Sequence, residues 1–350
     1  MLLSDFNYDL KTELIAQEQA VPRDSARLML INRQTGEISH HHISDLPTLI
    51  PQDYAIVANN TKVFPARLLG AKPTGGKVEV LLTKPLGHSS YLCIARPGLK
   101  VGDVINFPHA LSGTITHVSD IERTIHFNQE ESVLRTTLSQ IGTMPTPPYI
   151  KKLLGNSADY QTIYAKYGFS AAAPTAGLHF TPELLKRIKG DLPRRQAGHD
   201  WNELTLNVGL GTFLPVKEDK VENHHMHAES YTISPTLSAK LQSYDQGKKI
   251  LAIGTTTMRA LESDPALIPG THSTSIFIYP PYQFKLTDAL MTNFHLPGST
   301  LLMLVSAFCS APQTDVPFTT FADSLLGKAY RIAVEEKYRF FSFGDAMLII

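Results

Sequence analysis

The chain has 350 residues, of which 43% are hydrophobic and 18% charged, so it is long enough for two globular domains with sizeable cores. Its 32 basic and 32 acidic residues cancel, so any nucleic-acid binding must come from local basic patches. Two cysteines exclude a disulfide framework and a cysteine metal quartet, and they fit a reducing cytoplasm. No segment predicts a signal peptide, and the longest apolar run, 301–308, is too short to span a bilayer.

Short strands dominate the stretch from residue 78 to residue 127. Runs rich in β-branched and aromatic residues alternate with turn pairs such as Pro97-Gly98 and Gly102-Asp103. Several short strands without helices between them predict a small β-barrel. The expected strands are 77–82, 91–95, 104–107, 113–116 and 124–127.

The rest of the chain mixes helices and strands. It is separated from the strand-rich stretch by a proline-rich segment, 144–149. Helices are expected at 160–167, 182–189 and 234–246. A continuous apolar run at 249–253 predicts a strand that is buried on both faces.

The loop 173–180, Ala-Pro-Thr-Ala-Gly-Leu-His-Phe, consists of small residues and ends in a histidine flanked by apolar side chains. Thr181, Pro182 and Glu183 then suit the N-cap, the first position and the positive end of a helix. Such a loop lets a ligand approach the backbone closely, and His179 offers one titratable group. A tight turn with a half-buried histidine explains the same pattern.

Histidines also gather at 222–229. His224, His227 and Glu229 are residue types that bind zinc, but no helical His-Glu-x-x-His pattern is present, and 231–234 predicts a strand. We favour a polar catalytic wall over a metal site at this segment. A set of hydrogen-bonded structural histidines is the third interpretation.

The strand at 249–253 runs into Gly254-Thr255-Thr256-Thr257 and a predicted helix at 258–262. A small polar turn before a helix is a natural site for a carboxylate or phosphate, with Arg259 nearby. An ordinary strand-to-helix connection explains the same residues. No Walker lysine follows the turn, and 209–213 lacks the third glycine of a dinucleotide fingerprint, which excludes ATP hydrolysis and nicotinamide binding.

Two later segments are also dense in functional groups. The first is 292–297, Thr-Asn-Phe-His-Leu-Pro, which is centred on a histidine. The second is 338–347, where aromatic rings alternate with Arg339 and Asp345. Aromatic faces can hold a nucleobase or a sulfonium. The plainer interpretation is that the rings fill the core and that Arg339 and Asp345 form an ion pair.

Together these motifs resemble the S-adenosylmethionine:tRNA ribosyltransferase-isomerases of queuosine biosynthesis. The matching motifs occur in order and span nearly the whole chain. They are 5–6 (Asp-Phe), 59–62 (Asn-Asn-Thr-Lys), 75–82, 142–145 (Gly-Thr-Met-Pro), 160–165, 174–180, 224–227, 254–256, 292–297 and 338–341 (Tyr-Arg-Phe-Phe).

The resemblance implies a fold. A discontinuous larger α/β domain, 1–62 and 142–350, would carry an inserted small β-barrel domain, 63–141, where the strand-rich stretch lies.

The resemblance also implies a reaction. The ribosyl group of S-adenosylmethionine would pass to 7-aminomethyl-7-deazaguanine at the wobble position of a tRNA anticodon and isomerise there. The products would be epoxyqueuosine, adenine and methionine. S-adenosylmethionine is then a co-substrate, and neither a bound cofactor nor a metal is expected. The resemblance implies a cytoplasmic protein, which we expect to be monomeric and to have that tRNA as its partner and no contact with a membrane.

Such a reaction needs proton transfers beside the sulfonium, at adenine and at the attacking amine, and histidine suits them because its pKa lies near neutral. His179 is the expected base, while His224 and His227 would serve adenine or the amine. Arg259 and the turn at 254–256 are assigned to the methionine carboxylate. All the residues expected to bind substrate are Thr175, Gly177, Glu229, Gly254, Thr255, Thr256, Arg259, Asn293, His295, Tyr338, Arg339 and Asp345.

Three positions depart from the family pattern. Asn207 stands where the family usually has histidine, Pro281 replaces a usual glycine, and Asn223 replaces a common aspartate. The first departure changes the number of groups that can transfer protons. The alternative interpretation is therefore a catalytically altered paralogue that acts as a tRNA-binding or regulatory protein.

Overall fold

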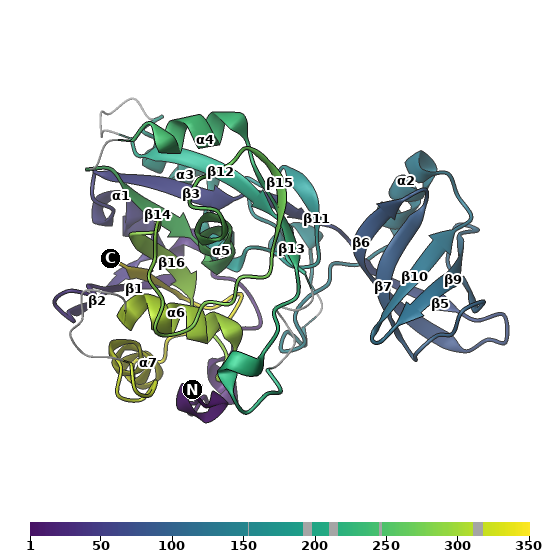
Figure 1. Cartoon of the computed structure of the whole chain (residues 1–350), viewed down its shortest axis with the longest axis horizontal. Coiled ribbons are helices and arrows are strands. Elements are labelled where there is room, and N and C mark those ends of the chain that lie inside the picture. Colours follow the sequence, from purple (N-terminus) through teal and green to yellow (C-terminus); the bar gives the residue numbers. More distant parts are fainter. Residues whose placement is uncertain (153, 192–197, 210–215, 245–246, 311–317) are drawn as a thin grey trace.

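The computed structural model describes residues 1–350 except 153, 192–197, 210–215, 245–246 and 311–317. A β-barrel stands at one end of a larger α/β body (Figure 1). The larger body contains a nine-stranded sheet in the order β15-β13-β12-β3-β14-β16-β17-β1-β2. Its strands are β1 (Arg27–Ile31), β2 (Ile38–His42), β3 (Tyr54–Asn59), β12 (Asp200–Leu206), β13 (Glu229–Ile233), β14 (Lys249–Ile253), β15 (Gly270–Thr274), β16 (Ala289–Asn293) and β17 (Ala346–Ile349).

The centre of this sheet is parallel, because β12, β3, β14 and β16 run in the same direction. Every residue of β3 is buried, and successive side chains point to opposite faces. Ile56 and Ala58 belong to one core, and Val57 belongs to the other. The strand predicted at 249–253 is β14, and it is buried on both faces as expected.

Helices cover both faces of the sheet. Residues of α4 (Pro235–Gln242), α5 (Thr255–Ser263), α6 (Thr300–Ser310) and α7 (Leu325–Glu335) fill one core, and residues of α1 (Leu46–Leu49) and α3 (Pro182–Lys189) fill the other. The start predicted for α3 is confirmed, since the Thr181 side chain accepts a hydrogen bond from the Leu184 N–H. The helix expected at 234–246 ends at Gln242, and residues 245–246 lie outside the described part of the chain.

The barrel is closed and antiparallel, in the order β10-β7-β6-β5-β8-β9. All five expected strands are present, and the predicted small barrel is confirmed. Sequence reasoning missed β5 and the helix α2 (Glu131–Ile141), whose Leu134 and Leu138 join the barrel core. The strands are β5 (Arg67–Ala71), β6 (Lys77–Gly87), β7 (Ser90–Arg96), β8 (Val104–Asn106), β9 (Ser112–Ser119) and β10 (Glu122–Phe127).

Two short parallel strands, β4 (Thr61–Val63) and β11 (Tyr167–Ser170), pair beside the barrel. The helix expected at 160–167 is wrong, because the chain forms a 3₁₀ turn at Ser157–Tyr160 and then extends into β11. The Gln161 amide accepts from the Val63 N–H at 3.1 Å and donates to the Val63 carbonyl at 3.2 Å. This side chain therefore pairs with β4 as a strand would, and the tertiary contact overrides helix propensity.

Short 3₁₀ helices occupy several loops of the larger body, including the histidine-bearing loop. They are Leu3–Phe6, Thr12–Leu14, Arg23–Ser25, Ile43–Asp45, Thr175–His179 and Val221–Asn223. The boundaries of the inserted domain, 62/63 and 141/142, stay a prediction. Among the described residues, no helix has the length and apolarity needed to cross a bilayer.

Candidate active site

A cavity of about 100 Å³ lies where β14 and β16 end, between the starts of α5 and α6. Six of the predicted substrate-binding residues line it: Thr175, Gly254, Thr255, Thr256, Asn293 and His295. Sequence reasoning missed other lining residues, among them Tyr149, Val208, Ser299 and Ser342. The hydroxyl oxygens of Tyr149 and Ser342 lie 2.7 Å apart. Neither side chain has the charge or the ring nitrogen that makes a histidine a candidate from sequence alone.

Two helix starts contribute to the wall of this cavity. Gly254 has a φ of 89°, which lets the chain turn from β14 directly into α5. At the start of α6, the Ser299 hydroxyl accepts from the Leu302 N–H at 3.2 Å. The first N–H groups of a helix lack partners within the helix and carry partial positive charge. A cavity flanked by two such ends suits a carboxylate.

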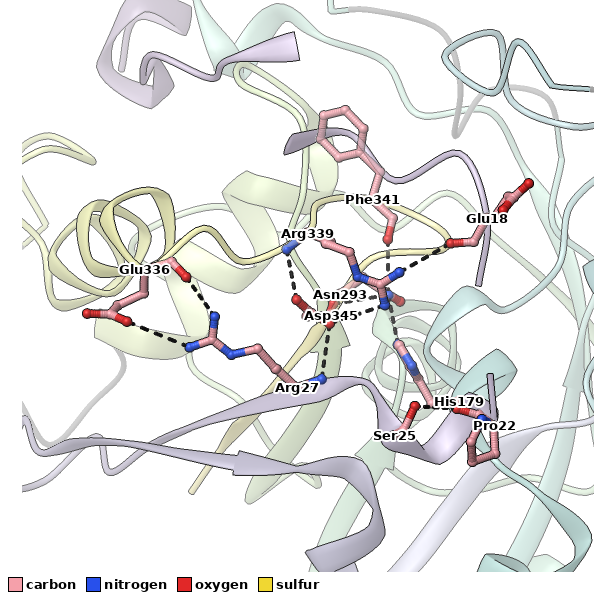
Figure 2. Close-up of polar contacts among 10 residues, drawn as sticks. All are labelled: Glu18, Pro22, Ser25, Arg27, His179, Asn293, Glu336, Arg339, Phe341 and Asp345. Carbon is pink, nitrogen blue, oxygen red and sulfur yellow. Dashed lines mark hydrogen bonds and ion pairs between the residues drawn. The ribbon is translucent and has the colours of Figure 1, made fainter. Parts of the chain in front are cut away.

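Asn293 offers an acceptor to whatever fills the cavity. Its Nδ2 donates to the carbonyls of Phe341 at 3.2 Å and Asp345 at 3.4 Å, and lies 3.0 Å from His179 Nε2 (Figure 2). Two carbonyls at Nδ2 fix the orientation of the amide. The buried Oδ1 then has no partner within the described residues, which is a costly state unless a ligand donor reaches it.

His179 lies behind Asn293 and does not line the cavity itself. Since the amide donates to Nε2, the ring proton belongs on Nδ1. Burial lowers the pKa of His179 to about 3, and the charges of Arg339 and Arg23 contribute. His179 is therefore neutral at pH 7, and in the empty site it is a weaker base than an exposed histidine.

His295 is the second buried histidine of the site, and it does line the cavity. Its Nε2 lies 2.8 Å from the Thr292 hydroxyl, and its backbone N–H donates to the Tyr330 hydroxyl at 2.8 Å. Burial lowers the pKa of His295 to about 3. Its ring therefore offers neutral hydrogen-bonding groups to a ligand.

Acid is expected to destabilise the larger domain through His179 and His295. The unfolded chain protonates both below about pH 6.5, whereas the fold holds both pKa values near 3, so stability is lost as pH falls through this window. Between pH 8 and pH 5 the two histidines together should lower the free energy of unfolding by about 4 kcal/mol. Urea unfolding followed by Trp201 fluorescence at several pH values measures the loss. A His179→Gln/His295→Gln variant should show a much flatter profile, and an equally steep one would contradict the assignment.

Glu229 and Arg259 form a buried ion pair, and neither residue lines the cavity. The Glu229 carboxylate also accepts from the Gly209 N–H at 2.9 Å. His224 packs against the Phe277 ring with centroids 5.2 Å apart, and His227 is exposed. The structure thus does not bring these predicted residues to the cavity wall, and within the described residues no group of three His, Cys, Asp or Glu side chains could hold a metal.

Asp345, Tyr338 and Gly177 were also predicted to bind substrate, and in the structure they contact other parts of the chain. Asp345 accepts hydrogen bonds from the backbone N–H groups of Arg27 at 3.0 Å and Arg339 at 2.8 Å, and Figure 2 shows it between these residues. Tyr338 is buried, with the Arg27 guanidinium 3.7 Å from its ring centroid. Gly177 packs so closely that an added Cβ would lie 2.1 Å from the Tyr164 hydroxyl. These residues hold the chain around the site without lining the cavity.

Asn207 sits next to the cavity-lining Val208 and ties β4 to β11. Its Oδ1 accepts from the Thr61 hydroxyl at 2.9 Å and from the Phe169 N–H at 3.1 Å. These are hydrogen bonds of an amide that does not titrate near neutral pH. The sequence 208–211 after it predicts a strand end that opens into a turn, and residues 210–211 lie outside the described residues. Of the two other departures from the family pattern, Pro281 follows a cis peptide bond and Asn223 ends a 3₁₀ helix.

Asn207→His is therefore expected to change kcat/KM by no more than about tenfold, or 1.4 kcal/mol of barrier. Steady-state kinetics of the purified variant beside the parent protein measures it. A gain of several orders of magnitude would instead mean that the parent lacks an essential proton-transfer group.

Comparison with known proteins places the chain. The family model described as "Queuosine biosynthesis protein" matches residues 3–349. The S-adenosylmethionine:tRNA ribosyltransferase-isomerase of Symbiobacterium thermophilum is 46% identical over 100% of both chains, and that of a Thermoanaerobacter species is 44% identical over the same share. The crystal structure of S-adenosylmethionine tRNA ribosyltransferase from Thermotoga maritima matches with a TM-score of 0.53 and 35% identity, covering 99% of this chain and 100% of that one. With its barrel, its sheet and its full-length match, the chain belongs to the queuosine biosynthesis protein family.

Proposed function

We propose that this protein is an S-adenosylmethionine:tRNA ribosyltransferase-isomerase. The observation that carries the proposal is the match, at 44–46% identity over the whole chain, to enzymes with that name. The substrates are S-adenosylmethionine and a tRNA. More finely, the acceptor is 7-aminomethyl-7-deazaguanine at the wobble position, and the products are epoxyqueuosine, adenine and methionine.

The inner cavity holds the carboxylate end of S-adenosylmethionine in this proposal. Its carboxylate lies against the N–H groups at the starts of α5 and α6, which Gly254 and Ser299 introduce. The Asn293 Oδ1 accepts a hydrogen bond from a ribose hydroxyl or the amino group, since it has no other partner in the described part of the chain. Thr175 and His295 complete the polar wall.

His179 is the proposed proton acceptor, reached through the small space that it lines with Ser342 and Arg23. The roles of His224 and His227 stay predictions, and we assign Glu229 and Arg259 to holding the fold. The protein acts as a cytoplasmic monomer without a bound cofactor or metal in this proposal; light scattering of the purified protein tests the oligomeric state.

Incubation with S-adenosylmethionine and precursor-bearing tRNA tests the function. Free adenine and methionine are expected in equal amounts, and the tRNA should gain the mass of the isomerised ribosyl group. A matched tRNA with guanine at the wobble position should release no adenine. Methylated tRNA with S-adenosylhomocysteine would contradict the proposal, and tight tRNA binding without adenine release would favour the paralogue interpretation.

A further inference from the structure

We propose that the site has two chambers, and that an outer groove beside His179 receives the nucleobase presented by the RNA loop. This inference rests on the proposed function and adds to it the place of the second substrate. The groove has a volume of about 620 Å³, compared with about 100 Å³ for the inner cavity. Its walls consist of residues 17–23 and 180–182, together with Lys152, Leu154, Gly155, Asp159, Ile163 and Phe343.

Shared residues connect the two chambers. A small space between them is lined by Gln19, Ala20, Arg23 and Phe343, all of which also line the outer groove. Ser342 lines this space and the inner cavity. His179 lines only the space between the two chambers. His179 therefore lies between the groove and the inner cavity.

The two chambers differ in how exposed their walls are, and this difference indicates which substrate each chamber receives. The inner cavity is walled largely by buried residues such as Ala172 and Phe294, so it suits a small molecule that can be enclosed. The outer groove has exposed walls at Gly155, Lys152 and Val21, whose side chain is 94% exposed. A base carried by a macromolecule can reach only a chamber that is open in this way.

The chemistry of the groove fits a planar base with N–H donors attached to phosphate. Pro22 is exposed and supplies apolar surface for ring contact, while Phe180 and Phe343 are buried beneath the wall. Gln19 Nε2 donates to the Asp159 carbonyl, so its Oε1 faces away as an acceptor, and this buried atom has no partner among the described residues. Arg23 and Lys152 are the cations of the groove, and each pairs with a carboxylate that also lines it, Asp159 and Glu18, so a phosphate would compete with these carboxylates.

Gly155→Trp tests the assignment, because a Cβ at Gly155 would meet nothing within 4 Å, so the ring fills the groove without displacing the fold. The expected result is a KM for precursor-bearing tRNA that rises at least about tenfold, within the range of lost base stacking. The Kd for S-adenosylmethionine, measured by calorimetry without RNA, should stay within about twofold. Gly247→Trp is the matched control, since Gly247 is also exposed and unobstructed, and it should change neither value.

Val21→Asp is the second variant, and it decides the question if the tryptophan variant does not fold. Its exposed side chain would place a negative charge at the rim, so the KM for the tRNA should rise while the Kd for S-adenosylmethionine holds. A weakened Kd for S-adenosylmethionine with an unchanged KM for the tRNA would give the groove to the small substrate instead. If neither value changed, the groove would lie outside the site. Failure of the proposed function looks different, since the parent protein would then release no adenine.

Discussion

Replacement of His179 by alanine is expected to lower kcat by at least about a hundredfold, the range for loss of a general acid or base. His179 lines the space between the inner cavity and the outer groove and holds Asn293 through Nε2. Its pKa of about 3 keeps the ring neutral in the empty site, and Nε2, which carries no proton and accepts from Asn293, is the nitrogen that would take up a proton. Rates of adenine release at saturating substrates measure the effect.

His179→Gln separates proton transfer from positioning. A glutamine carbonyl can accept the hydrogen bond of Asn293, as His179 Nε2 does, but it does not take up a proton near neutral pH. If His179 is the base, the glutamine variant should be as slow as the alanine variant. Activity within about tenfold of the parent would make His179 a positioning residue that acts through Asn293.

Replacement of Glu229 by glutamine is expected to destabilise the larger domain by about 3–5 kcal/mol, the cost of leaving a buried charge unpaired. Arg259 and Glu229 are both buried, and the Arg259 Nε and Nη2 have no partner in the part of the chain that the structure describes. Trp201, the single tryptophan, lies on β12 beside β13, which begins with Glu229. Its fluorescence during urea unfolding therefore reports on this domain alone.

The double variant Glu229→Leu/Arg259→Met provides the control. Removing both charges should recover most of the lost stability, because apolar residues of similar volume often replace a buried pair without cost. The double variant should bind S-adenosylmethionine with a Kd within about threefold of the parent if Arg259 lies outside the cavity wall. If the folded double variant no longer bound S-adenosylmethionine, Arg259 would instead be assigned to binding the methionine carboxylate, as the sequence predicts.

Local patterns in the sequence predicted the elements whose stability is local. The barrel strands alternate in polarity and end in turns, and α3 carries its cap at Thr181, so both followed from the residues alone. The segment 160–167 failed because its conformation depends on Gln161 pairing with Val63, almost a hundred positions away in the chain. The short strand β5 was missed for a similar reason. Its Gly70 is required by close contact with Ile105 and Phe107, which are distant in the sequence.

The site was predictable as a set of loops and less so as a set of contacts. Polar motifs at 174–180, 254–256 and 292–297 do meet at one cavity. Residue type alone did not reveal that Arg259 points to Glu229, or that Asp345 accepts from the backbone N–H groups of Arg27 and Arg339. The sequence shows the chemical type of a charged side chain, but the direction in which that side chain points depends on the partner that the fold places nearby.

The position of β17 sets an order of events during synthesis. The residues of this strand, 346–349, follow those of the sheet's other eight strands in the sequence, yet it lies inside the sheet between β16 and β1. The barrel, built from residues 67–127, can close while the ribosome is still making the rest. β1 cannot pair with β17 until residues 346–349 have been synthesised, and the cavity wall is incomplete until Phe341 and Ser342 have been added. A chain that stops before residue 341 therefore has every strand of the barrel but lacks part of the cavity wall.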